Sequence, residues 1–181
     1  MRSIVSMTAA ACAVAVLASS AFAQTPTPAA PPAQPPSGGT PDAMPFDIPY
    51  GAPISLEHAE AAIAATVAEA RKHDWKLNVA VVDSAGNLVA FQRMDGAQLA
   101  SIQIAEHKAR TAATFRRETK VFENAIQQSN FHYVMTLDGV IASRGGIPLV
   151  QAGKLVGAIG CSGGTGSQDE VACRVGAATI K

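Results

Sequence analysis

The sequence predicts an α+β domain built on an antiparallel sheet. Apolar residues switch between helical spacing and short β-branched runs in the order helix, two strands, two helices, about three strands, helix. Tight turn sequences separate the paired strands, which favours hairpins over the crossover connections of a parallel sheet. We therefore expect a central antiparallel sheet of about five strands flanked by helices.

The first half of this domain is predicted to contain a helix and a hairpin. Ser55 is a favourable N-cap residue, and apolar residues recur at helical spacing from there to about His73. Two apolar runs follow, Leu77–Val82 and Leu88–Arg93, and the turn cluster at 83–87 joins them. This arrangement is typical of a β-hairpin.

A second helix is predicted from Gln98 to Phe115, with two different faces. One face carries small and apolar residues that allow close packing on a sheet: Ile102, Ala105, Ala109 and Ala112. The opposite face is a polar stripe of His107, Arg110, Thr111 and Thr114. The polar stripe is the candidate for binding chemistry.

The remaining elements are less regular. We predict a third helix from Thr119 to Gln128, a short strand at Val140–Ala142, and a second hairpin formed by Ile147–Gln151 and Lys154–Cys161. The last helix is predicted to start at Ser167. Ser167 and Glu170 fit a capping box, and the predicted buried face is Val171, Val175 and Ala178.

Residues 1–50 are predicted to lie outside the folded domain. Residues 1–23 have the parts of a secretory signal peptide: Arg2, an apolar run and a small-residue cleavage site at Ala21-Phe22-Ala23. Nine of the 11 prolines fall within residues 24–50, a composition typical of a disordered linker. We therefore expect an exported protein, periplasmic or secreted, with one domain at 51–181 and no membrane span after cleavage.

Cys161 and Cys173 are the two cysteines of the predicted domain. In an oxidising compartment they could form a disulfide, provided that the last helix folds back over the strand that carries Cys161. Two buried free thiols are the alternative.

Several classes of function lack their motifs. The 14 basic and 14 acidic residues give a net charge of +0, which does not favour nucleic-acid binding. The glycines at 157, 160 and 163 have neither the Walker lysine nor Rossmann spacing, and the histidines and cysteines lack zinc-site spacing. Ser162 has no G-x-S-x-G elbow around it, so a hydrolase is disfavoured.

Haem needs only an apolar slot, an axial ligand and a cation near its propionates. His107, Arg110 and Thr111 could supply a ligand, a cation and a hydroxyl from one helical face. The alternative is that these residues form an ordinary solvated helix surface.

Four blocks of sequence, in order, resemble the GlcG/HbpS family of haem-binding proteins, which is related to the C-terminal domain of PduO-type corrinoid adenosyltransferases. The blocks are Val79–Val89 with Arg93–Ala97, Lys108–Ala112, Gly145–Pro148 and Gly157–Glu170. The resemblance implies a profilin-like fold, a homo-oligomer that is often an octamer, and haem as the cofactor. It also implies that Thr111, with His107 one turn earlier, lies at the haem iron, with Arg110 and Thr114 nearby.

From the residues and the resemblance together we expect an exported haem-binding protein that senses, sequesters or degrades haem, in some relatives together with a sensor protein. Whether it is an enzyme is left open, because the sequence shows neither an oxygen path nor a reductant. Two alternatives stay open: a non-haem oligomeric accessory protein that binds a small organic acid, and a purely structural assembly domain.

Overall fold

A computed structural model describes residues 42–181. The four helices are α1 (Leu56–Lys72), α2 (Ser101–Thr114), α3 (Thr119–Gln127) and α4 (Gly166–Ala177), with a short 3₁₀ helix, η1, at His132–Thr136. The four strands are β1 (Asn78–Asp83), β2 (Leu88–Arg93), β3 (Gly146–Gln151) and β4 (Lys154–Ser162). The predicted α+β class is therefore confirmed.

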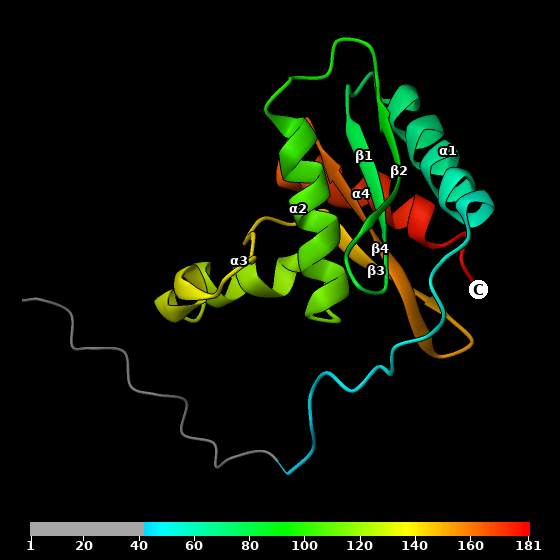
Figure 1. Cartoon of the computed structure of the whole chain (residues 1–181). Coiled ribbons are helices and arrows are strands. Elements are labelled where there is room, and N and C mark those ends of the chain that lie inside the picture. Colours follow the sequence, from blue (N-terminus) through cyan, green and yellow to red (C-terminus); the bar gives the residue numbers. More distant parts are fainter. Residues whose placement is uncertain (1–41) are drawn as a thin grey trace, which may run out of the picture. The chain divides into compact units, whose positions relative to one another are not determined.

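The strands form one antiparallel sheet in the order β2-β1-β4-β3 (Figure 1). Both predicted hairpins are present, and the central pair β1 and β4 joins them. Ala80 lies opposite Gly160 in this pairing, and Val82 lies opposite Ala158. Strands from the two halves of the chain therefore form the middle of the sheet.

Helices cover both faces of the sheet (Figure 1). Helices α1 and α4 pack on one face over the larger core, which includes Val79, Val81 and Ile159. Helix α2 packs on the other face over a core of small residues that includes Ala80, Ala109 and Ala158. The alternation of side chains along β1 divides the two cores.

A glycine in β4 lets α2 lie close to the sheet. A Cβ atom at Gly160 would come within 2.1 Å of Ala105 O and 2.5 Å of Ala109 N. No side chain fits in that space, so the backbone of α2 rests directly on β4. Gly160, in the glycine-rich second half of β4, thus has a packing role.

The sheet has four strands, and the strand predicted at Val140–Ala142 is wrong. These residues follow η1 in an irregular segment and make no ladder within residues 42–181. The backbone N of Ile141 donates to a side chain, Thr111 Oγ1, where a strand would donate to a neighbouring backbone carbonyl. One isolated parallel bridge, Tyr50 to Leu155, extends the sheet instead.

The start and the buried face predicted for the last helix are also wrong. Thr165, not Ser167, is the N-cap of α4, and it forms the capping box with Gln168. Val171 and Val175 are exposed, and the face toward the sheet carries Asp169, Glu170, Ala172, Cys173 and Gly176. Two of these residues have specific partners across the fold, because Asp169 pairs with Lys108 on α2 and Cys173 bonds to Cys161 on β4.

A disulfide joins Cys161 on β4 to Cys173 on α4, with a Cα–Cα distance of 5.8 Å. Of the two alternatives for these cysteines, the structure has the bonded one. Helix α4 folds back over the strand, as this pairing requires, and both cysteines are fully buried.

The predicted signal peptide and most of the predicted linker lie outside the described residues. The last linker residues contact the domain: Arg116 Nη1 donates to Ile48 O, and Tyr50 Oη donates to Thr114 O. Among residues 42–181, no helix has the length and apolar character needed to cross a membrane.

Substitution of Gly160 by alanine should lower the free energy of unfolding by at least about 2 kcal/mol, because the new methyl group would push α2 away from β4. Gly153→Ala is the control. A Cβ there meets nothing within 4 Å, and only its φ of +74° opposes the change, which costs about 1 kcal/mol. Chemical denaturation measures both variants, and equal losses would contradict the packing role.

Replacement of both Cys161 and Cys173 by alanine should lower the free energy of unfolding by about 3 kcal/mol, the loss expected for a short closed loop. Reduction of the wild-type protein should have a similar effect and leave the double variant unchanged. Thiol counting on denatured, unreduced protein that lacks the leader should find no free thiol. Two free thiols would contradict the bond.

Candidate functional site

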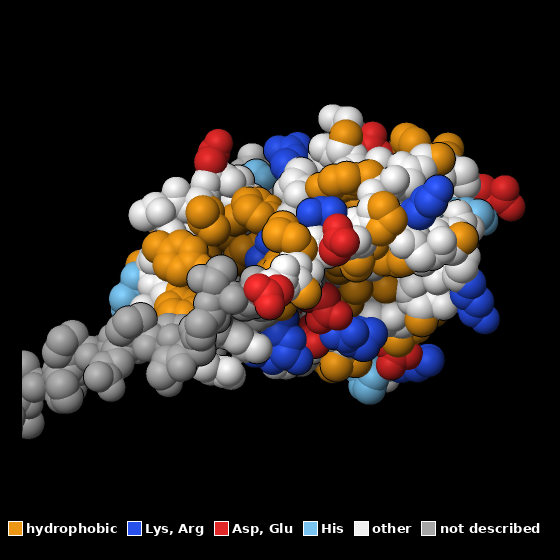
Figure 2. Space-filling model, turned by 90° about the horizontal axis from the view of Figure 1, so that it is seen from below, with side chains coloured by type: hydrophobic (Ala, Val, Ile, Leu, Met, Phe, Trp, Pro, Cys, Tyr) orange, Lys and Arg blue, Asp and Glu red, His pale blue; other side chains and the backbone are white. Residues whose placement is uncertain are grey.

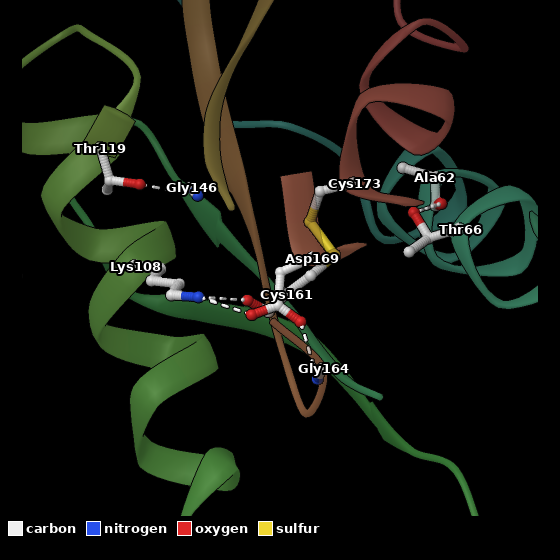
Figure 3. The surroundings of a disulfide bond; sticks show 9 residues. All are labelled: Ala62, Thr66, Lys108, Thr119, Gly146, Cys161, Gly164, Asp169 and Cys173. Carbon is white, nitrogen blue, oxygen red and sulfur yellow. Dashed lines mark hydrogen bonds and ion pairs between the residues drawn. A yellow bond between two sulfur atoms is a disulfide. The ribbon is translucent and has the colours of Figure 1, made fainter. Parts of the chain in front are cut away.

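Helix α2 carries a buried charge on the face toward the sheet. Lys108 is only 1% exposed. Its Nζ donates to Asp169 Oδ2 at 2.8 Å and to Cys161 O at 3.0 Å, and Asp169 Oδ1 accepts from Gly164 N (Figure 3). One lysine thus links α2 to the end of β4 and to the first turn of α4.

The close approach at this ion pair depends on a second glycine. Gly145 has a φ of +113°, and a Cβ atom there would lie 2.8 Å from Asp169 Cβ and 3.2 Å from Lys108 Nζ. Burial raises the pKa of Asp169, and the Lys108 ammonium acts in the opposite direction. The pair is therefore a structural element of the core and is not exposed to substrate.

The opposite face of α2 borders a cavity of about 400 Å³, which we call the α2 cavity. Its walls are His107 and Arg110 from α2 and the irregular segment Asp138, Gly139, Val140 and Ile141. A volume of this size is typical of a small-molecule site. Two of the four predicted site residues, His107 and Arg110, therefore line one cavity.

Thr111 lies beneath this cavity wall and is fully buried. Its Oγ1 donates to Gly139 O at 2.9 Å and accepts from Ile141 N at 3.1 Å. The predicted polar stripe is thus interrupted, because Thr111 holds the 138–141 segment onto α2. In this conformation its hydroxyl is already hydrogen-bonded, and its role as an iron ligand stays a prediction.

Arg110 and Thr114 have different surroundings. Arg110 Nε donates to Gly86 O at 3.3 Å in the β1–β2 turn, and Arg110 also lines the α2 cavity. Thr114 Oγ1 donates to Arg110 O, and its side chain faces Tyr50 and Ser84 in a separate hollow. Thr114 therefore does not line the α2 cavity.

An ion pair between Arg144 and Glu123 holds the chain three residues after the 138–141 wall. Arg144 donates from Nε and from its backbone N to the carboxylate of Glu123 on α3, at 2.7 Å in each case. Burial opposes ionisation of Glu123, but the hydrogen bonds from Arg144 outweigh it and lower the pKa of this carboxyl. The irregular segment is thus fixed at Thr111 and at Glu123.

Sequence reasoning did not predict Lys108, Asp169 or the 138–141 wall. Lys108 follows Ala105 by three residues and precedes Ala112 by four, so helical spacing places it on the small-residue face. That position was the available signal for a buried lysine. Nothing local indicated the wall, because its shape depends on contacts with α2 and α3.

The residues that the structure describes contain no group of three or more His, Cys, Asp and Glu side chains placed to hold a metal ion. His107 is a single imidazole at the cavity, and Asp138 is the one carboxylate in its wall. His107 could therefore be an axial ligand to a metal ion that a bound cofactor already holds.

Comparison with known proteins identifies the family. Residues 54–178 match the family model described as "Haem degrading protein HbpS-like". The chain belongs to the HbpS-like family. The predicted resemblance to GlcG and HbpS is therefore confirmed.

The chain is also similar to individual known proteins, which agrees with this assignment. Protein GlcG of Escherichia coli strain K12 is 39% identical to the chain over 109 residues, which cover 60% of this chain and 81% of GlcG. A crystal structure of a double mutant of Streptomyces reticuli HbpS has 31% identity and a TM-score of 0.66, and the match covers 81% of this chain and 99% of HbpS. The structure of PduOC in complex with haem has 28% identity and a TM-score of 0.65, and covers 71% of this chain and 96% of PduOC.

Substitution of Lys108 by methionine should make stability depend on pH. Burial already raises the pKa of Asp169 above its ordinary value of 3.8, and loss of the Lys108 ammonium should raise this pKa further. Such a group stabilises the fold below its unfolded pKa, and this stabilisation is lost as pH rises through the folded pKa. Relative to wild type, the free energy of unfolding of the variant should change little near pH 4 and should be about 3 kcal/mol lower at pH 7.

Addition of Asp169→Asn to Lys108→Met removes the titrating group, so the dependence on pH should flatten. Denaturation of wild type, single and double variants across pH 4–7 measures this. A single variant with a loss independent of pH would contradict the assigned ion pair.

Proposed function

We propose that this member of the HbpS-like family is an exported haem-binding protein that holds haem in the α2 cavity. The single observation that carries the proposal is that His107 and Arg110 line one cavity together with the apolar side chains of Val140 and Ile141. The haem complex of PduOC, a relative with the same fold, supports it.

The residues at the cavity fit the chemistry of haem. Within residues 42–181 the ring of His107 has no hydrogen-bond partner, so a nitrogen is free to bind iron. Arg110 can donate from its terminal nitrogens to a propionate. Val140 and Ile141 supply apolar surface against which a macrocycle can pack.

The hydrogen bonds of Thr111 favour His107 as the protein ligand. Iron coordination by Thr111 Oγ1 would compete with the bonds to Gly139 O and Ile141 N and would release the cavity wall. His107 reaches the cavity with that wall in place. In the proposal Thr111 is a positioning residue and His107 is the ligand.

If bound, haem would supply an iron centre capable of oxygen chemistry, with His107 holding the iron and Arg110 a propionate. Haem degradation, which the family description names, would require oxygen and a reductant in addition to this site. Sensing or sequestration requires binding alone. Assembly into a homo-oligomer, in some relatives an octamer, and contact with a sensor protein stay predictions.

Titration of the protein with haemin, followed by the Soret band, tests the proposal. His107→Ala should weaken binding about tenfold or more and shift the band, because the axial ligand is lost. Arg110→Ala should weaken binding without a band shift. Thr111→Val should also preserve the band position, since its effect is on the wall.

His58→Ala is the matched control, because His58 is exposed in the first turn of α1, where its backbone N donates to Ser55 Oγ. Its titration should equal that of wild type. A wild-type protein that leaves the Soret band of free haemin unchanged would overturn haem binding. A His107→Ala variant that titrates as wild type, with Thr111→Val shifting the band, would move the ligand to Thr111.

A further inference from the structure

A second and larger cavity lies between α3 and the segment that follows it. Its volume is about 530 Å³, and we call it the aromatic pocket. Aromatic rings from three parts of the chain line it: Phe46; Phe115 and Phe122; and Phe131 and Tyr133. Figure 2 shows hydrophobic side chains gathered at the end of the molecule where Figure 1 places α3.

Aromatic rings in the walls of the aromatic pocket pack against one another. Phe115 and Phe122 meet edge to face with centroids 5.3 Å apart, and Phe131 lies 5.8 Å from Tyr133 in a tilted arrangement. Val121, on the outer side of α3, is 40% exposed although it lines the pocket. Rings at these separations are suited to pack against a flat apolar body.

One cation stands in this apolar wall. The guanidinium of Arg117 lies 3.4 Å from the centroid of Phe46 and 5.3 Å from that of Phe122, and its Nε donates to Phe115 O. Arg117 is partly buried. Burial is the largest influence on its pKa, which it lowers.

No carboxylate neutralises Arg117 in the part of the chain that the structure describes. The adjacent acidic residue, Glu118, already accepts a bidentate contact from Arg174, with N–O distances of 3.1 and 2.9 Å. The terminal nitrogens of Arg117 have no acceptor among residues 42–181. A partly buried cation without a counter-charge is costly, and an anion that enters the pocket would relieve that cost.

We propose that the aromatic pocket is a second binding site, which takes a flat apolar carboxylate. The apolar body lies against Phe122 and Phe131, and the carboxylate accepts from the terminal nitrogens of Arg117. Stacking on Phe46 holds the guanidinium plane and leaves its outer edge for a bidentate contact. The site shares no lining residue with the α2 cavity.

Calorimetric titration with naphthalene-2-carboxylate tests this site, with naphthalene-2-methanol as the uncharged match. Wild type should bind the carboxylate at least about tenfold more tightly than the alcohol, the gain expected from a charge-assisted contact. Arg117→Met should abolish that preference. Arg71→Met, which removes an exposed cation at the end of α1, should keep it.

Because Arg117→Met could lose binding through unfolding, a second variant at the exposed Val121 tests the same site. Val121→Glu places a carboxylate beside Arg117, so it should prevent binding of naphthalene-2-carboxylate, and Val121→Gln should retain it. Equal affinity for carboxylate and alcohol, or binding that Arg117→Met or Val121→Glu leaves unchanged, would overturn the proposal.

Two further measurements separate other occupants of the pocket. If wild type binds neither naphthalene compound and Val121→Glu splits an oligomer in sedimentation, the pocket is a contact between copies, and the proposal is wrong. Haemin titration of Val121→Glu should match wild type. If Val121→Glu loses the Soret shift and His107→Ala keeps it, haem binds in the aromatic pocket. The proposal that this pocket takes a different ligand would then be wrong.

Discussion

The buried ion pair between Lys108 and Asp169 is the constraint on which the arrangement of this domain depends. A lysine at 1% exposure is tolerable only where its charge is matched, and here the match comes from a different layer of the fold. The same ammonium holds the carbonyl of Cys161, so α2, β4 and α4 meet at one nitrogen. The small residues around it let these elements approach closely enough for that contact.

The position of α2 in turn determines what its other face can do. With Lys108 directed into the core, His107 and Arg110 face away from the sheet, and Thr111 lies at the edge between the two faces. That edge position lets its hydroxyl hold the 138–141 segment, which forms the remaining wall of the α2 cavity. The cavity therefore follows from how the helix is rotated about its axis.

The parts of the fold that could be predicted from the sequence are those with local causes. Helix α1 begins at its Ser55 cap, and both hairpins follow from turn residues between β-branched runs. At α4, two pairs fit a capping box, Thr165 with Gln168 and Ser167 with Glu170, so local chemistry did not choose between them. The observed start at Thr165 goes with two tertiary contacts of α4 that the sequence pattern did not indicate, Asp169 with Lys108 and Cys173 with Cys161.

Site prediction from sequence had the same limit. The polar stripe on α2 was visible as a spacing, and it supplied His107 and Arg110. The burial of Thr111 depends on a segment about 30 residues later that has no periodicity of its own, so no pattern could indicate it. Arg117 lacked any signal as well, because its significance comes from Glu118 being paired with Arg174 across the fold.

The position of the disulfide beside the ion pair limits how the cysteines can pair. Cys173 lies one turn after Asp169 on α4, so the ion pair with Lys108 places α4 where Cys173 lies over Cys161. Among residues 42–181 no other cysteine competes for either sulfur. Within residues 42–181 a single disulfide isomer is therefore possible, and its formation requires an oxidant but no disulfide reshuffling.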